Sequence, residues 1–228
     1  MKKYDLNVVI LAYSRPETFQ KVAKACEKSL NRVKVVIDYP ENVLISEKQD
    51  KIIEIINSLE IECDVVRRKE NYGLVKSVLT TVKEGLSNND HIVLLEDDCL
   101  PDEQFFDFMS MSLSKHHDDK LVSSVCGTVT KCAFNPWGWA TWAHKWRYEH
   151  LSKEEMLGIS NLDMDLRKFL ENNNVEDSIW SLSWLAYQYK NSCTAVFPCK
   201  NLIKNIGIND SGVHSHEKGY TNWLLSQI

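Results

Sequence analysis

Several features that would assign a function at once are missing from the sequence. No apolar run approaches the roughly 20 residues that a membrane-spanning helix needs. No GxxxxGK[ST] phosphate loop occurs, which excludes a P-loop kinase. The charged residues show no basic excess, and the formal net charge is −5. A non-specific nucleic-acid binder needs a basic face, so that class is excluded as well.

The cysteines include no CxxC pair and are scattered along the chain. That pattern favours reduced thiols in a cytoplasmic protein. Cys126, Cys132, Cys193 and Cys199 remain open as zinc ligands, although their spacing is wider than in common zinc sites. Two lysines precede a short apolar run near the N-terminus, without a small-residue cleavage site. We therefore interpret that run as a first strand and not as a secretory signal.

The 228 residues, of which 43% are hydrophobic, are enough for one domain with a sizeable core. In the first half, short apolar segments alternate with helical patterns. The segments expected to be strands are 7–13, 33–38, 63–68 and 91–97, and the expected helices are 16–30, 46–59 and 72–86. This alternation predicts an α/β fold, in which helices cover both faces of a mostly parallel sheet.

The second half has a different character. It predicts helices over 102–117, 163–172 and 177–190, strands over 121–127 and 193–198, and a polar loop over 205–220. A Trp-rich segment, "FNPWGWATWAHKWRYEH", lies among these elements and contains nothing typical of a linker. We therefore expect one continuous domain over residues 1–228.

The loops that follow the first four strands are the best candidates for a site. Ligands of open α/β sheets bind beyond the carboxyl ends of the strands. This rule selects the loops 12–16, 38–42, 67–74 and 96–101.

Three acids, Glu96, Asp97 and Asp98, follow a buried strand directly. Strand alternation would put Glu96 and Asp98 on one side and Asp97 on the other. Three close carboxylates repel one another unless a cation or hydrogen-bond donors lie among them. Hard oxygen ligands of this kind suit Mg²⁺ or Mn²⁺. The alternatives are a solvated acidic turn and a capping network for the helix after Pro101.

The other three loops carry matching groups. Arg15 follows the first strand and can meet a phosphate, and Asp38 can accept hydrogen bonds from a base or ribose. Asn71, Gly73 and Lys76 lie where a loop enters a helix, which is an anion-facing position. Arg, Asp and Asn also occupy loops for turn reasons alone. Taken together, the four loops indicate a nucleotide diphosphate with a metal.

Five segments resemble glycosyltransferases of the GT-A fold: "VVILAYSRPETF", "ENYGL", "VLLEDDCLPDEQFFDFM", "WGWATW" and "NIGINDSGVHS". The sequence is most similar to the N-acetylglucosaminyltransferase I type and its bacterial polysaccharide-synthesising relatives, and the resemblance covers most of the chain. It implies a Rossmann-like sheet, a nucleotide-sugar donor such as a UDP-sugar, and Mn²⁺ or Mg²⁺. It also implies a nucleotide-sugar-binding half, 1–100, and an acceptor-binding half, 101–228.

The resemblance assigns roles to the residues at the strand ends. Arg15 and Asp38 match positions near the nucleotide. Glu96 and Asp97 match acids that contact the nucleotide-sugar, and Asp98 matches the acid that holds the metal between the two phosphates of the donor.

The same resemblance extends to the second half. Glu176 and Asp177 look like the acidic pair that supplies the catalytic base, although two residues separate Asp177 from the following Trp. We favour Asp177 as the base. The alternative is that both acids interact with a helix dipole. His214 and His216 lie in the segment that folds over the donor in this family, and either can touch metal or phosphate or remain a solvated loop residue.

Trp137, Trp139 and Trp142 are candidates for an acceptor floor or for core packing. Gly138 between the first two is expected where the backbone needs an unusual dihedral angle. Trp137, Gly138 and Trp139 are the acceptor-binding residues that we predict.

One base and no covalent nucleophile predict inversion at the anomeric carbon of the sugar. The acceptor is expected to be a glycan or a lipid-linked oligosaccharide in bacterial surface polysaccharide synthesis, such as capsule or lipopolysaccharide. The enzyme is expected in the cytoplasm, with peripheral association at the inner face of the membrane left open. One alternative is a nucleotidyltransferase, although "AYSRPETF" lacks the glycines of its phosphate loop. The other is a non-catalytic nucleotide- or glycan-binding module of a larger synthase.

Overall fold

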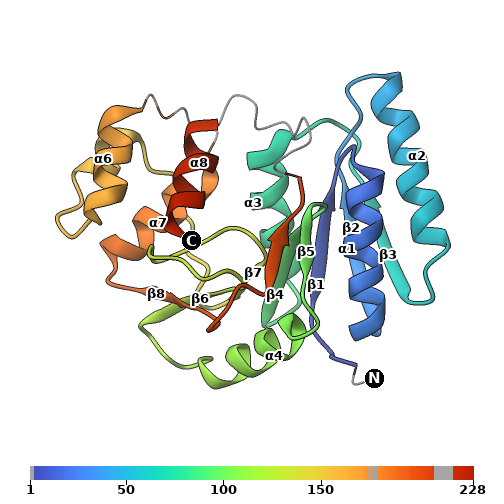
Figure 1. Cartoon of the computed structure of the whole chain (residues 1–228), viewed down its shortest axis with the longest axis horizontal. Helices are drawn as coiled ribbons and strands as arrows, with labels where there is room; N and C mark the ends of the chain where they lie inside the picture. Colours follow the sequence, from blue (N-terminus) through green and yellow to red (C-terminus); the bar gives the residue numbers. More distant parts are fainter. Residues whose placement is uncertain (1–2, 174, 176–178, 208–217) are drawn as a thin grey trace.

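The computed structural model describes residues 3–173, 175, 179–207 and 218–228. The first half alternates strands and helices, as the sequence predicts (Figure 1). Its elements are β1 (Val8–Ala12), α1 (Pro16–Ser29), β2 (Arg32–Ile37), α2 (Val43–Asn57), β3 (Glu62–Arg67), α3 (Gly73–Leu86) and β4 (His91–Glu96).

The second half adds short strands and five helices. Its elements are β5 (Cys99–Pro101), α4 (Phe105–Lys115), β6 (Val122–Cys126), β7 (Trp139–Trp142), α5 (Lys153–Leu157), α6 (Met164–Asn172), α7 (Trp180–Lys190), β8 (Thr194–Val196), β9 (Ile203–Asn205) and α8 (Lys218–Gln227).

The central sheet has seven strands in the order β3-β2-β1-β4-β7-β6-β8. Strands β1 to β4 pair in parallel, β7 runs antiparallel to both β4 and β6, and β8 is parallel to β6. A second, two-stranded antiparallel sheet joins β5 to β9. The expected fold class, a mostly parallel Rossmann-like sheet of the GT-A kind flanked by helices, is therefore confirmed.

The strands β5, β7 and β9 and the helices α5 and α8 were not predicted. Strand β7 lies inside the Trp-rich segment, where its residues pair with β4 from Leu94–Trp139 to His91–Trp142. Every residue of β7 is buried, so polar alternation, the usual sign of a half-exposed strand, is absent. Helix α2 begins at Val43 and not at the expected Ser46, because the Asn42 side chain accepts a hydrogen bond from Ile45 N.

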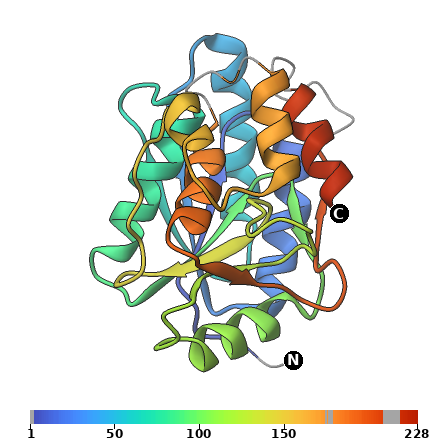
Figure 2. The same ribbon diagram turned by 90° about the vertical axis from the view of Figure 1, so that its left-hand side faces the viewer.

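Helices cover the sheet from both sides. Helix α3 packs on β1 and β4, while α4 packs on β6 and β7. In both views α4 lies below the strands of the second half, and α6, α7 and α8 lie above them (Figures 1 and 2). No helix within the described ranges is long and apolar enough to cross a membrane.

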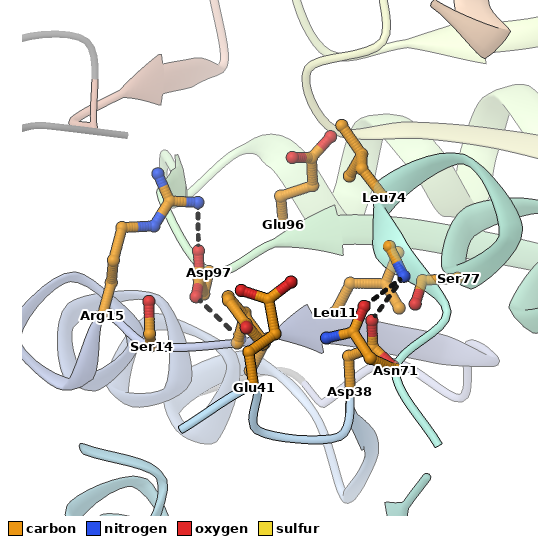
Figure 3. Close-up of a pocket in the computed structure, with 13 residues that line it drawn as sticks. Leu11, Ser14, Arg15, Asp38, Glu41, Asn71, Leu74, Ser77, Glu96 and Asp97 are labelled. Carbon is orange, nitrogen blue, oxygen red and sulfur yellow. Dashed lines mark hydrogen bonds and ion pairs between the residues drawn. The ribbon is translucent and has the colours of Figure 1, made fainter. Parts of the chain in front are cut away.

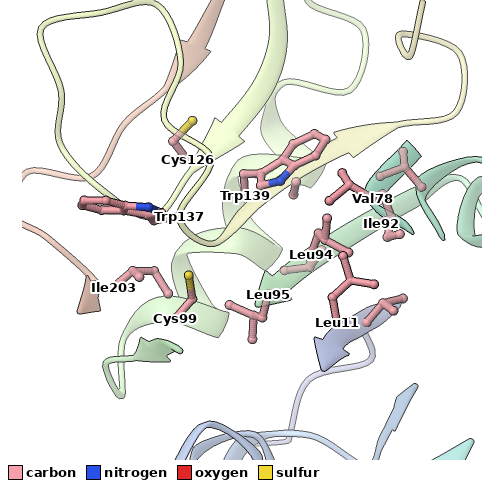
Figure 4. Close-up of a cluster of buried hydrophobic side chains, with 14 of the residues drawn as sticks. Leu11, Val78, Ile92, Leu94, Leu95, Cys99, Cys126, Trp137, Trp139 and Ile203 are labelled. Atoms are coloured by element: carbon pink, nitrogen blue, oxygen red, sulfur yellow. The ribbon is translucent and has the colours of Figure 1, made fainter. Parts of the chain in front are cut away.

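The core joins the two halves of the chain. Leu95 of β4 and Ile203 of β9 both lie against Gly138, and Leu11 of β1 and Trp139 of β7 belong to the same cluster (Figure 4). The inner strands are therefore held by apolar contacts on both faces, as parallel strands require. This packing holds the carboxyl ends of β1, β2 and β4 in one place.

Candidate functional site

A pocket with a cavity volume of about 190 Å³ opens at the carboxyl ends of β1, β2 and β4 (Figure 3). Its walls come from the segments after the first four strands. The lining residues are Leu11, Ala12, Tyr13, Ser14, Arg15, Asp38, Glu41, Asn71, Gly73, Leu74, Ser77, Glu96 and Asp97. All except Leu11 and Ser77 belong to the four loops that the strand-end rule selects, so that rule located the pocket.

Arg15 holds two of the three acids together. Its Nη1 donates to Asp98 Oδ2 at 2.6 Å, and its Nη2 donates to Asp97 Oδ1. Asp97 is 2% exposed and Asp98 is 4% exposed. The alternative of a solvated acidic turn is therefore wrong, and a cation does lie among the carboxylates, as their mutual repulsion requires.

The acids do not cap the next helix. The N-cap of α4 is Gln104, and it makes no side-chain cap bond, so the capping-network alternative is wrong too. The expected alternation also fails, because β4 ends at Glu96 and the chain turns over Asp97 and Asp98. As a result Glu96 and Asp97 line the pocket and Asp98 does not.

Burial and the ion pairs shift the pKa values of these groups in opposite senses. Burial lowers the pKa of Arg15, but Asp97, Asp98 and Glu96 outweigh it and raise the pKa well above its ordinary value. Burial raises the pKa of Asp97 to about 6, against the opposing effect of Arg15. The guanidinium therefore stays charged, while the carboxylate of Asp97 is more easily protonated than an ordinary Asp side chain.

Gly207 packs on the Arg15–Asp98 ion pair from the C-terminal part of the chain. A Cβ on this residue would overlap Asp98 Oδ2 and lie 2.7 Å from Arg15 Nη1. The neighbouring Ile206 N donates to the Asp98 carbonyl oxygen at 2.9 Å. Sequence reasoning missed this residue, because nothing in "NIGIND" indicates which side chain lies above the glycine.

Asp38 organises the wall of the pocket through its carboxylate. Its oxygens accept four contacts of 2.9–3.1 Å from three backbone N–H groups, those of Tyr39, Tyr72 and Gly73. The residue is 9% exposed. The carboxylate thus fastens the loop before α3 to the end of β2, and its hydrogen-bonding capacity is already used by the backbone.

Asn71 and Gly73 line the same wall, whereas Lys76 does not. Asn71 Nδ2 donates to Tyr39 O at 2.8 Å, and Gly73 adopts a φ of +65°. Lys76 Nζ lies 3.0 Å from Glu70 Oε1 and 3.8 Å from the centroid of the Tyr72 ring. The structure therefore brings Arg15, Asp38, Asn71, Gly73, Glu96 and Asp97 around one pocket and leaves Lys76 at its outside.

The predicted acceptor residues lie in the core. Trp139 is 1% exposed and packs edge-on against Phe134, and Trp137 is also buried. Gly138 has a φ of +61°, which confirms the unusual dihedral angle expected there. The indole of Trp139 therefore offers no open face to a ligand in this structure, which is a correction to its proposed place in an acceptor floor. Trp142, at 1% exposed, is core as well.

Four predicted site residues, Glu176, Asp177, His214 and His216, lie outside the described residues. Within the described part of the chain, no group of three or more His, Cys, Asp or Glu side chains is arranged to hold a metal ion. The zinc alternative for Cys126, Cys132, Cys193 and Cys199 therefore finds no support. All the cysteines are described, and each is a free thiol.

Comparisons with known proteins show the fold. Neither a protein family nor a curated protein matches the sequence. The structure is similar to S. aureus TarS 1–349, with a TM-score of 0.50 and 13% identity over 87% of this chain. The chain spans 60% of the length of that TarS chain.

Two further enzymes have lower TM-scores. The 4-diphosphocytidyl-2C-methyl-D-erythritol synthase of Anaerococcus prevotii DSM 20548 has a TM-score of 0.46 and 9% identity, covering 88% of this chain and 91% of that one. A UDP-glucose pyrophosphorylase complexed with UDP-glucose has a TM-score of 0.44 and 12% identity, covering 97% and 98%. Scores below 0.5 support no inference about function.

Proposed function

We propose that this protein is a glycosyltransferase that moves a sugar from a nucleotide-diphosphate donor, a UDP-sugar, to a hydroxyl of a glycan or lipid-linked acceptor. The observation that carries the proposal is the pocket at the carboxyl ends of the parallel strands, where Arg15, Glu96 and Asp97 meet. The motif resemblance supports a role in bacterial surface polysaccharide synthesis. In this proposal residues 1–100 bind the donor and residues 101–228 bind the acceptor.

Arg15 is the proposed contact for the diphosphate. Among the described residues, the bonds to Asp97 and Asp98 use two of the five guanidinium N–H groups, and we propose that the others bind phosphate oxygens. The acids hold the guanidinium in place, and its permanent charge suits the negative charge that develops on the leaving diphosphate. Arg15 would thus bind the donor and stabilise the leaving group from a pre-set position.

Asp98 is the proposed ligand of a divalent cation. Its Oδ2 accepts from Arg15, while the contact of its Oδ1 is the Cys99 thiol at 3.7 Å, which is a weak donor. A single hard oxygen fits Mg²⁺ or Mn²⁺, because these ions are bound by one or two carboxylates together with substrate phosphates. When bound, such an ion supplies Lewis-acid stabilisation of the leaving diphosphate. His214 or His216 is proposed to complete the site.

The acceptor hydroxyl needs a base, and we propose Asp177, with Glu176 as the second candidate. A single carboxylate that takes the acceptor proton, with no covalent nucleophile, corresponds to inversion at the anomeric carbon. The variants Asp177→Asn and Glu176→Gln, made separately, would identify the base, because only the true base should lower the rate of transfer while leaving donor affinity unchanged.

Ligand-dependent melting tests the donor proposal directly. The protein is melted with UDP, GDP, CDP and dTDP, each with and without Mn²⁺. A nucleotide at a hundred times its dissociation constant adds about 2.7 kcal/mol of stability. We expect the largest shift with UDP and Mn²⁺. The absence of any shift with all four nucleotides would end the donor proposal.

The metal assignment is tested with Asp98→Asn. We expect this variant to lose the Mn²⁺-dependent part of the UDP shift and to keep the metal-independent part. The matched control is Asp118→Asn, because that side chain is 96% exposed and lies outside the pocket. An Asp98→Asn protein with the full Mn²⁺ effect would contradict the assignment.

The reaction type is tested by product analysis. A glycosyltransferase releases UDP from a UDP-hexose in the presence of acceptor, or slowly with water. A nucleotidyltransferase instead releases pyrophosphate from a nucleoside triphosphate and a sugar phosphate. A protein that binds UDP and releases neither product would be the non-catalytic module.

A further inference from the structure

Two of the described side chains that line the pocket, Tyr13 and Ser77, carry a buried hydroxyl with no hydrogen-bond partner. The Tyr13 hydroxyl interacts electrostatically with Glu41 and lies near Asn71, so Ser77 is the one considered for a ligand. Ser77 is 6% exposed, and its Oγ is buried with no hydrogen-bond partner within the part of the chain that the structure describes. Buried hydroxyl groups in native proteins nearly always have a partner, because leaving one unpaired is costly. Ser77 lines the pocket, so a ligand there is the natural partner.

Helix α3 contributes both its first residue, Gly73, and Ser77 to the pocket wall. Ser77 comes four residues after Gly73, and residues at this spacing lie on the same face of a helix. Both residues line the pocket. Among the described residues, nothing lies within 4 Å of the position that a Cβ on Gly73 would take, so the wall is open at Gly73.

The side chains differ between the two ends of the pocket, although each end also has a carboxylate, Asp97 beside Arg15 and Asp38 near Ser77. Arg15 is the one cationic side chain among the described lining residues, and it lies on the opposite side of the pocket from Ser77 (Figure 3). The apolar side chains of Leu11 and Leu74 lie on the Ser77 side. A nucleotide with its phosphates at Arg15 would therefore have its uncharged end near Ser77.

The residue expected to contact the base is already occupied. The carboxylate of Asp38 accepts from the backbone N–H groups of Tyr39, Tyr72 and Gly73. Using it for a ligand would mean breaking bonds that hold the loop before α3 in place. Ser77 Oγ makes no hydrogen bond to the described residues, and a serine hydroxyl can both donate and accept.

We propose that Ser77 is a base-recognition residue, whose Oγ forms a hydrogen bond with the polar edge of the donor's nucleobase. The proposal rests on the proposed function, since it takes the ligand of this pocket to be a nucleotide. It assigns to α3 a recognition role that the strand-end loops do not provide. Ser77 would act in binding and not in the transfer step.

Calorimetric titration of Ser77→Ala with UDP, UMP and uridine tests this role. We expect each affinity to fall about tenfold, which corresponds to roughly 1.4 kcal/mol. The affinity for ribose 5-phosphate should stay unchanged, because this ligand lacks the base. The melting temperature of the unliganded variant should be equal to or above that of the wild type, because no protein hydrogen bond is lost.

The matched control is Ser112→Ala. Ser112 is also 6% exposed and also helical, but it lies in α4 and outside the pocket. We expect this variant to bind UDP, UMP and uridine with wild-type affinity.

Three results would overturn the proposal, and they can be told apart from failure of the proposed function. Wild-type uridine and UDP affinities in Ser77→Ala would exclude the base contact while leaving the donor proposal intact. A loss with ribose 5-phosphate equal to that with uridine would show a sugar contact instead. A lower melting temperature without ligand would show a structural serine. If the wild-type protein binds none of these compounds, the proposed function is contradicted, and the proposed role of Ser77 with it.

Discussion

Gly207 lies directly on the carboxylate of Asp98, so closely that a Cβ on the glycine would overlap Asp98 Oδ2. Asp98 follows β4 at the end of the first half, Gly207 follows β9 near the end of the second, and the pairing of β5 with β9 brings them together. The contact closes the Arg15–Asp98 ion pair on one side, and Asp98 remains only 4% exposed. On that side Asp98 is thus covered by the backbone of Gly207.

Gly207→Ala should disturb this ion pair. The added methyl group must displace Asp98 or Arg15, and overpacking of this kind costs about 1–3 kcal/mol. Urea denaturation would measure the loss. Gly158→Ala is the control, because Gly158 has an ordinary φ of −71° and a Cβ there would come no closer than 3.3 Å to a neighbour. Equal stability of Gly207→Ala and wild type would contradict the close contact.

Arg15→Gln should destabilise the protein much more. It leaves the buried carboxylates of Asp97 and Asp98 without their cation, and removing one partner of a buried pair costs about 3–5 kcal/mol. The measurement is again the free energy of unfolding in urea at pH 7.

A double-mutant cycle provides the control for that loss. In an Asp97→Asn background one buried charge is gone, so Arg15→Gln should cost less than it does in the wild type. If the two losses simply add, Arg15 and Asp97 do not stabilise one another, and the ion pair has no energetic role.

The ion pair between Arg68 and Glu84 should make stability depend on pH. Arg68 Nη1 and Nη2 donate to the two carboxylate oxygens of Glu84, each at 2.8 Å. The hydrogen bond from Arg68 lowers the pKa of Glu84 below its ordinary value of 4.5. A lowered pKa stabilises the folded state above the ordinary value, and this stabilisation is lost as the pH falls through the folded-state value.

Glu84→Gln should therefore cost about 0.5–1 kcal/mol at pH 7, as expected for a well-aligned pair that is partly exposed. The difference from the wild type should shrink as the pH falls below 4.5. Unfolding free energies measured from pH 3 to pH 7 would show the trend. The exposed Glu47→Gln in α2 is the control, and we expect it to leave the free energy of unfolding at pH 7 unchanged. A difference that grows at low pH would contradict the argument.

The first half of the fold was readable from the sequence because its signals are local. The strands β1, β2 and β4 contain short apolar runs, β3 contains only the pair Val65 and Val66, and each helix between them repeats its apolar residues at helical spacing. The second half was harder, because β5, β7 and β9 are three or four residues long and are defined by partners far away in the chain. Helix α8 was missed because the polar residues before it predict a loop that extends to residue 220, whereas α8 begins at Lys218.

The site also contains residues that the sequence indicated and residues that it did not. The rule for parallel sheets selected the loops that line the pocket, and it therefore found Arg15, Asp38 and Glu96. Ser77 was missed although a signal existed, since it follows Gly73 by one helical turn. Lys76 was included because it is next to the right loop, but its side chain pairs with Glu70 on the outside. Being next to a selected loop does not show which of the two neighbouring residues, Lys76 or Ser77, faces the pocket.

The sequence by itself determined the strand–helix alternation, the edge of the sheet at which a ligand can bind, and the acids that gather there. Those properties follow from patterns only a few residues long. The tertiary structure alone decided that Arg15 lies between Asp97 and Asp98, that Gly207 covers Asp98, and that the backbone uses Asp38. These contacts join residues as much as 109 positions apart, as in Gly207 and Asp98, and only the packing of the whole sheet brings them together.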